Sequence, residues 1–218
     1  MNGPGPRGDG APPGANGPRP AASHERRGPV PRPIRLLLLA SSLWYFSEGL
    51  LGPLFAVFTE RIGGDLLDIT VAWALYLVAS GLAYLAVGRL LNRSRWKFRM
   101  IAVGYALNTV FTFAYLLVAD TLGLLLVQVG LGVAEAVATP SWDAYYASRL
   151  ADTDDTFAWG IASGHTQLIS GVAIAIGGLI ANFISFEALF VTMGLISLAA
   201  TLVQVRLTLL DERAARRA

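Results

Sequence analysis

Two carboxylates, Glu48 and Glu135, stand inside long apolar stretches of the sequence, WYFSEGLLGPLF (44–55) and GVAEAVATPSWD (132–143). In both stretches a proline follows the glutamate five residues further on. A charge at the centre of a bilayer costs about 2.5–3.5 kcal/mol or more, and a carboxyl there lowers this cost by staying protonated. Such a carboxyl can take up and release protons. The alternative is that each is a neutral, hydrogen-bonded interior glutamate.

Two polar side chains fall at helical spacing from these carboxylates. Tyr45 precedes Glu48 by three residues, and Gln128 precedes Glu135 by seven. Residues at these spacings share a helix face. We therefore expect Tyr45 and Gln128 to line a cavity with the glutamates, as substrate-binding or proton-coupling residues. For the aromatic residue the alternative is packing.

The elements that carry these residues are predicted to be membrane-spanning helices. The chain has 218 residues, of which 54% are hydrophobic and only 15% are charged, whereas a soluble domain has about 25% charged residues. Short polar breaks separate six apolar segments, and segments of about 20 residues span a bilayer as helices. The predicted segments are 34–60, 69–90, 99–118, 122–147, 158–182 and 187–207.

The two ends of the chain differ from this apolar part. Residues 1–33 contain nine Pro and seven Gly, and we expect a disordered tail rich in Pro, Gly and Arg. Residues 208–218 are expected to form a short charged tail. All but Arg61 of the 17 Lys and Arg residues lie on one side of the predicted helices. The positive-inside rule therefore places both tails in the cytoplasm, and we expect a multi-pass protein of the plasma membrane.

The break between the second and third segments carries a recognisable motif. It reads GRLLNRSRWKFRM (88–100) and resembles the signature loop of the major facilitator superfamily, roughly G-x-L-A-D-R-x-G-R-K. Gly88, Arg93 and Lys97 match, as does the Leu, while Asn92 replaces the usual Asp. The resemblance implies a cytoplasmic gating loop, and we expect Asp143 to pair with Arg93 at this side.

Two further helices are similar to the same family. The stretch QVGLGVAEAVATP (128–140) resembles the family's fourth helix, and the fifth predicted helix is rich in glycine, as in the family. Gly164, Gly171 and Gly178 recur every seven residues on one face, where small residues let helices approach closely.

The resemblance covers residues 34–207 and implies the architecture. We expect an all-α integral membrane protein whose six transmembrane helices form two inverted three-helix repeats, like one half of a twelve-helix family member. The first and fourth helices would then be equivalent. Glu48 and Glu135 would both lie near the bilayer midplane, where such transporters bind substrate.

The resemblance also implies a function. We expect secondary active transport of a small solute by alternating access, coupled to protons, with a second half supplied by a homodimer or by a separate half-transporter. The alternative is a non-transporting membrane protein, such as a relic half or a scaffold for partner proteins. Substrate, protons and lipid are the expected partners, without a cofactor or nucleic acid.

Other chemistries are disfavoured by the sequence. Ser163 and His165 are two residues apart on one helix and cannot form a Ser-His catalytic pair, so we do not expect an enzyme. No phosphate-binding motif is present, and two His without Cys cannot build a His- or Cys-rich metal site.

Overall fold

The structure, a computed structural model, describes residues 32–91, 96–148, 150 and 155–215, and the described residues form helices without any strand. Six of these helices are long and apolar enough to cross a membrane, which confirms the predicted all-α membrane fold. Residues 1–31 of the predicted tail lie outside the described residues. The helices are α1 (Arg32–Leu51), α2 (Leu54–Arg61), α3 (Leu66–Leu91), α4 (Lys97–Ala114), α5 (Thr121–Ser148), α6 (Asp155–Phe183) and α7 (Phe186–Ala215), with a 3-10 turn, η1 (Tyr115–Leu117), after α4.

The first predicted segment, 34–60, is two helices rather than one. The chain bends at Gly52, whose φ is +28°, and Pro53 precedes the first residue of α2. Pro53 lacks the N–H that a continuous helix needs, and its ring clashes with the carbonyl four residues earlier. Pro140, in contrast, lies inside the unbroken α5.

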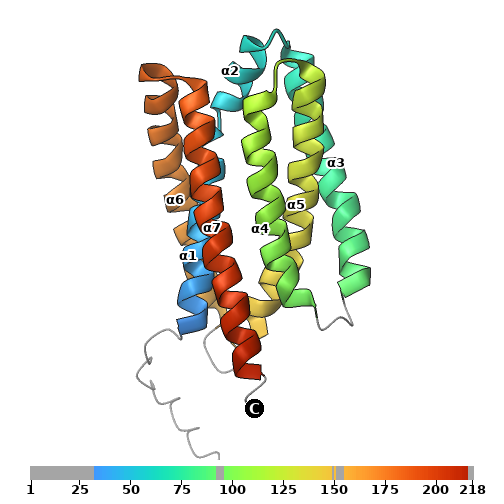
Figure 1. The fold of residues 1–218 in the computed structure, drawn as a ribbon, viewed down its shortest axis with the longest axis vertical. Coiled ribbons are helices and arrows are strands. Elements are labelled where there is room, and N and C mark those ends of the chain that lie inside the picture. The colour runs from blue at the N-terminus through green and yellow to red at the C-terminus, as the bar shows by residue number, and fades with distance from the viewer. Residues whose placement is uncertain (1–31, 92–95, 149, 151–154, 216–218) are drawn as a thin grey trace, which may run out of the picture. The chain divides into compact units, whose positions relative to one another are not determined.

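The helices pack in the order α3, α5, α4, α7, α1, α6, with α4 and α7 in the middle. Helix α1 packs against α6 and α7, while α5 packs against α3 and α4, and α4 joins the two groups through α7. Figure 1 shows α1, α6 and α7 on one side and α3, α4 and α5 on the other. Helices α3 and α6 make no extended contact, so they form the two edges of an open face.

Glycines allow two close helix crossings. A Cβ at Gly132 of α5 would lie 2.6 Å from the backbone oxygen of Tyr76 in α3. A Cβ at Gly177 of α6 would overlap the backbone oxygen of Leu50 in α1. These crossings bring α3 onto α5 and α6 onto α1, because without side chains the backbones can touch.

Polar groups join α4 to α7. The Asn108 amide donates to Ser197 Oγ at 3.3 Å, and Thr109 Oγ1 lies 2.9 Å from the hydroxyls of Ser197 and Thr201. All four side chains are buried. In an apolar interior such hydrogen bonds hold helices together.

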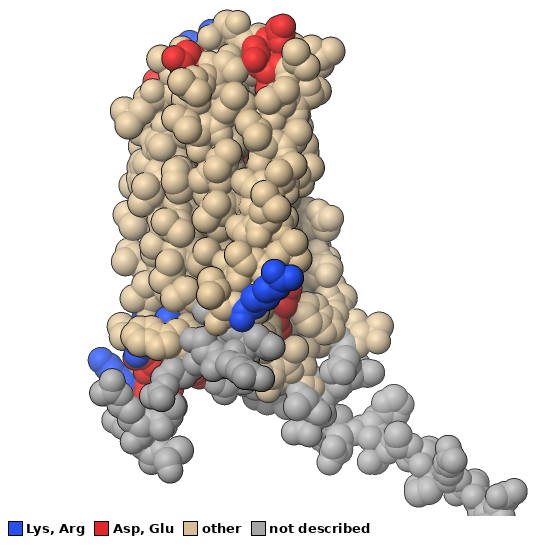
Figure 2. Space-filling view, turned by 90° about the vertical axis from the view of Figure 1, so that its right-hand side faces the viewer, with Lys and Arg blue, Asp and Glu red and all other residues tan. Residues whose placement is uncertain are grey.

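Charged groups gather toward the ends of the bundle. Figure 2 shows a largely uncharged surface between the two ends of the bundle, with acidic and basic atoms toward each end. Large apolar side chains such as Leu82 on α3 and Leu202 on α7 are well exposed between these ends. This pattern suits a helix bundle surrounded by lipid.

Candidate functional site

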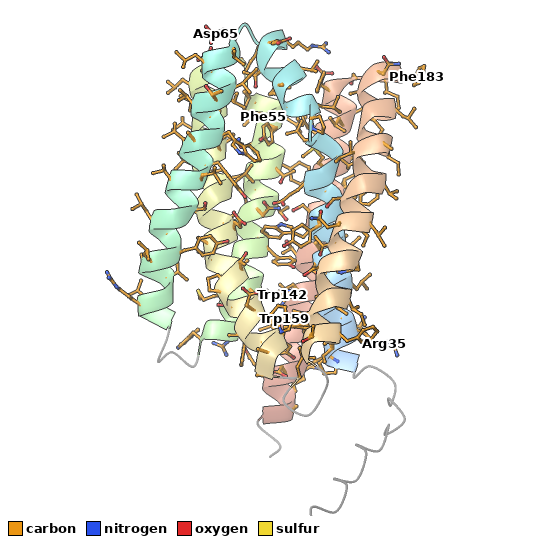
Figure 3. All side chains as sticks on the ribbon, turned by 180° about the vertical axis from the view of Figure 1, so that it is seen from behind. Arg35, Phe55, Asp65, Trp142, Trp159 and Phe183 are labelled. Atoms are coloured by element: carbon orange, nitrogen blue, oxygen red, sulfur yellow. The ribbon has the colours of Figure 1, made fainter. Side chains whose placement is uncertain are left out.

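A cleft between α1 and α5 holds two cavities, one toward each end of the bundle. Figure 3 looks onto this open face, with Phe55 on one side of the cleft's middle and Trp142 and Trp159 on the other. The outer cavity, near Phe55, has a volume of about 210 Å³. The inner cavity, near Trp142, has a volume of about 430 Å³.

The outer cavity contains Glu48 in a mainly apolar wall. Leu51, Phe55 and Met193 lie around it, with Trp73 and Tyr76 contributed by α3 and with Thr112, Tyr115, Gln128 and Leu131 completing the lining. Glu48 hydrogen-bonds to Trp44, one turn earlier on α1. This carboxyl therefore faces a cavity with little other polar support.

Glu135 has more polar partners than Glu48. The Tyr76 hydroxyl donates to Glu135 Oε2 at 2.5 Å, across the crossing that Gly132 permits. The Tyr84 hydroxyl interacts with Glu135 and with Thr139. Two tyrosines of α3 thus orient the carboxyl of α5.

The two glutamates lie close enough to interact electrostatically. Tyr45 interacts with both of them from the inner cavity. Gln128 lines the outer cavity and accepts a hydrogen bond from the Tyr115 hydroxyl at 3.1 Å. The structure therefore places Glu48, Tyr45 and Gln128 in the walls of the two cavities, and Glu135 interacts electrostatically with Glu48 and Tyr45.

The gating residues predicted from the loop motif are only partly described. Asn92 and Arg93 lie outside the described residues, so the Arg93–Asp143 pairing stays a prediction. Lys97 begins α4, and Gly88 lies on α3 with no atom within 4 Å of a Cβ built there. Asp143 lines the inner cavity.

An ion pair that the sequence analysis missed closes the inner end between α4 and α7. Arg99 Nε donates to Glu212 Oε1, and the Arg99 guanidinium lies 4.3 Å from the centroid of the Trp96 ring. Helix α7 continues well past Leu207, the predicted end of the sixth segment, and so carries Glu212 to this position.

The three glycines of α6 do not contact the rest of the bundle. A Cβ built at Gly164, Gly171 or Gly178 would meet nothing within 4 Å, whereas the neighbouring Gly177 makes the close contact with α1. The predicted packing role of the three glycines therefore has no partner among the described residues and stays a prediction for another helix.

The α3 residues of the site were also missed. Tyr76 and Tyr84 are the two tyrosines of the mainly apolar helix α3, and their spacing of eight puts them on one face. That pattern was a usable signal. The His165 ring lies 2.7 Å from Ser42 Oγ and 3.0 Å from the Ala162 backbone oxygen.

Comparisons with known proteins agree with the resemblance of the loop and helix motifs. The family model described as Major Facilitator Superfamily matches residues 37–218. An uncharacterized MFS-type transporter of Methanocaldococcus jannaschii is 24% identical over 81% of this chain and 45% of its own length. A proton-coupled antiporter flippase, LtaA, of Staphylococcus haemolyticus is 23% identical over 57% of this chain and 32% of its own length. The chain thus spans less than half the length of these relatives.

Proposed function

The chain belongs to the major facilitator superfamily, and from this premise we propose that it forms one wall of a secondary transporter for a small solute. The transport would proceed by alternating access, in which two halves rock about a central site. The relatives named as transporters support the transport activity. The two cavities of the α1–α5 cleft support this cleft as the position of the solute.

The observation that carries the proposal is the position of the two glutamates. Glu48 lines the outer cavity and interacts electrostatically with Glu135, and the inner cavity lies toward the other end of the bundle. A solute or proton bound there could be passed from one cavity to the other. Ionisable groups inside a membrane bundle are functional candidates by default.

We propose that Glu48 and Glu135 couple solute movement to protons. Glu48 faces the outer cavity, and Tyr45, which interacts with Glu48 and Glu135, faces the inner one. Proton exchange with either side would then need only local changes in water access. Proton coupling is also named for a relative, the proton-coupled antiporter flippase, and this likeness supports the proposal.

The packing pattern supports the two inverted repeats. Helix α1 packs on the second and third spanning helices of the later repeat, α6 and α7. Helix α5 packs in the same way on those of the earlier repeat, α3 and α4. An inverted repeat related by a two-fold axis in the membrane would produce this reciprocal pattern.

The second half would cover the open face between α3 and α6. Few residues of these two helices are buried, compared with α1, α5 and α7. The uncovered glycines of α6 offer a surface that another helix can approach closely. We propose a second copy of this chain as the covering half, with a separate half-transporter as the alternative.

We propose a plasma-membrane location with both termini in the cytoplasm. Arg35 and Asp65 lie at opposite ends of the bundle in Figure 3. The described basic residues Arg89, Arg99 and Arg213 occupy loop-proximal positions on the side that the positive-inside rule assigns to the cytoplasm.

An uptake screen tests the function. The purified protein is reconstituted into liposomes, a pH gradient is imposed, and accumulated solutes from a metabolite mixture are identified by mass spectrometry. We expect wild-type protein to accumulate at least one solute. Glu60→Gln, at an exposed residue of α2, is the matched control. Unchanged accumulation by both Glu48→Gln and Glu135→Gln would contradict the assigned site.

A further inference from the structure

The inner cavity has aromatic walls. Trp44, Tyr45 and Tyr105 line one part of it, and the rings of Trp44 and Tyr105 have centroids 4.5 Å apart. Trp142 and Trp159 line another part, and both rings pack against Tyr146, with centroids 5.0 Å from it. Figure 3 shows Trp142 and Trp159 close together, from α5 and α6. These rings are held in place by neighbours rather than free to collapse into the cavity.

The described lining of this cavity carries negative charge and no positive charge. Asp143 is the charged residue of the described lining, which includes no Lys, Arg or His. The structure shows no hydrogen bond or ion pair between Asp143 and another described residue. Its electrostatic neighbours are the hydroxyl-bearing Tyr45 and Tyr84.

One donor in the wall lacks a partner. The Trp142 indole Nε1 is buried and has no hydrogen-bond partner among the residues that the structure describes. Buried polar groups are normally paired, so an unpaired group in a cavity wall suggests that a ligand or water completes it. An acceptor atom on a bound solute would satisfy this N–H.

These features together select a cation. Carboxylates in a partly desolvated site attract positive charge far more strongly than in water, and they repel anions to the same degree. The faces of Trp and Tyr rings also attract cations, with Trp the strongest of the side chains. Apolar parts of the solute would be buried against the same rings.

We propose that the inner cavity binds an organic cation that has an apolar body. Its positive centre lies between the Asp143 carboxylate and the rings of Trp44, Trp142 and Trp159. An acceptor atom of the solute receives the Trp142 N–H. The proposal rests on the proposed function in taking this cavity as the solute's position. It assigns Asp143 to solute binding in place of the predicted pair with Arg93, while Glu48 and Glu135 serve the proton.

A pair of ions with the same shape and opposite charge tests the charge selection. Tetraphenylphosphonium and tetraphenylborate are equilibrated with the full chain in nanodiscs, and binding to protein-free nanodiscs is subtracted. We expect the wild-type protein to bind the phosphonium at least ten-fold more tightly than the borate. Equal binding of the two ions would overturn the proposal, and this comparison needs no variant.

Two variants then assign the contacts. Asp143→Asn should weaken phosphonium binding by about ten-fold, and Trp159→Leu should weaken it by about five-fold, which Trp159→Phe should partly restore. Glu60→Gln, at the opposite end of the bundle, should change nothing. Unchanged phosphonium binding in Asp143→Asn would overturn the assignment of Asp143.

Because binding is measured without transport, the two proposals fail in different ways. Phosphonium binding that depends on Asp143, together with no gradient-driven uptake of any solute, would remove the transport function and leave the cation site. Uptake that depends on Glu48 and Glu135, together with no preference for the phosphonium, would remove the cation site and leave the transport function.

Discussion

The two glutamates of the cleft occupy unequal surroundings. Glu135 accepts the Tyr76 hydroxyl and interacts with Tyr84, while Glu48 lies among apolar side chains with Trp44 as its hydrogen-bond partner. A carboxyl with two phenolic neighbours is fixed in orientation, whereas one with less support can turn toward a cavity. We expect Glu48 to respond more to the bound solute and Glu135 to the packing of α3 on α5.

Removing the Tyr76 hydroxyl tests that difference. In Tyr76→Phe, Glu135 loses its 2.5 Å hydrogen bond, and the free energy of unfolding should fall by about 1 kcal/mol, the usual size of such bonds in membrane proteins. Reversible unfolding in mixed micelles measures it. Tyr45→Phe is the control, because no hydrogen bond to the Tyr45 hydroxyl is present among the described residues. An equal loss in both variants would contradict the special role of Tyr76.

At the residue scale, the sequence predicted the site only from the first and fourth spanning helices. Glu48, Glu135, Tyr45 and Gln128 could be found because helical spacing relates residues of one helix. The contribution of α3 depends on which face of α3 meets α5, and that is set by Gly132 and its neighbours in three dimensions. The sequence therefore shows the spacing of Tyr76 and Tyr84 on α3, but it does not show that this face of α3 packs against α5.

At the scale of the helices, the adjacent glycines Gly177 and Gly178 of α6 differ in the space available for a side chain, and this difference can be tested. Gly177→Ala places a Cβ against the backbone oxygen of Leu50, and overpacking of this kind costs about 1–3 kcal/mol. Gly178→Ala meets open space, and the higher helix propensity of Ala should leave stability unchanged or raise it by up to about 1 kcal/mol. Thermal unfolding of the two variants compares them directly. A larger loss in Gly178→Ala would contradict the described α1–α6 crossing.

The break between α1 and α2 shows what the sequence could not decide. Both glutamates are followed by proline at the same spacing, yet the helix is interrupted at Pro53 and continues through Pro140. Gly52 precedes Pro53 and takes a positive φ, whereas Thr139 precedes Pro140 and continues the helix. The number and order of the spanning helices follow from the apolar runs, because lipid leaves few other options. Local bends depend on the residues beside each proline.

For the whole molecule, we propose that a second copy of the chain covers the open face between α3 and α6. The chain contains no Cys, so a single introduced Cys reports on one position. Gly171→Cys, on the uncovered face of α6, should crosslink two copies in membranes, because small residues there permit close helix approach. Val110→Cys, on an exposed position of α4, is the control. Equal crosslinking at the two positions, or none at Gly171, would contradict a homodimer built on this face.

Coupling of solute to protons is the central claim, and one measurement addresses it most directly. Once the uptake screen has identified a solute, accumulation under a pH gradient is compared with exchange of labelled for unlabelled solute without a gradient, in the same liposomes. We predict that Glu48→Gln and Glu135→Gln lose gradient-driven accumulation but retain exchange, while Glu60→Gln keeps both. Gradient-driven accumulation at the wild-type level in both cleft variants would contradict the account.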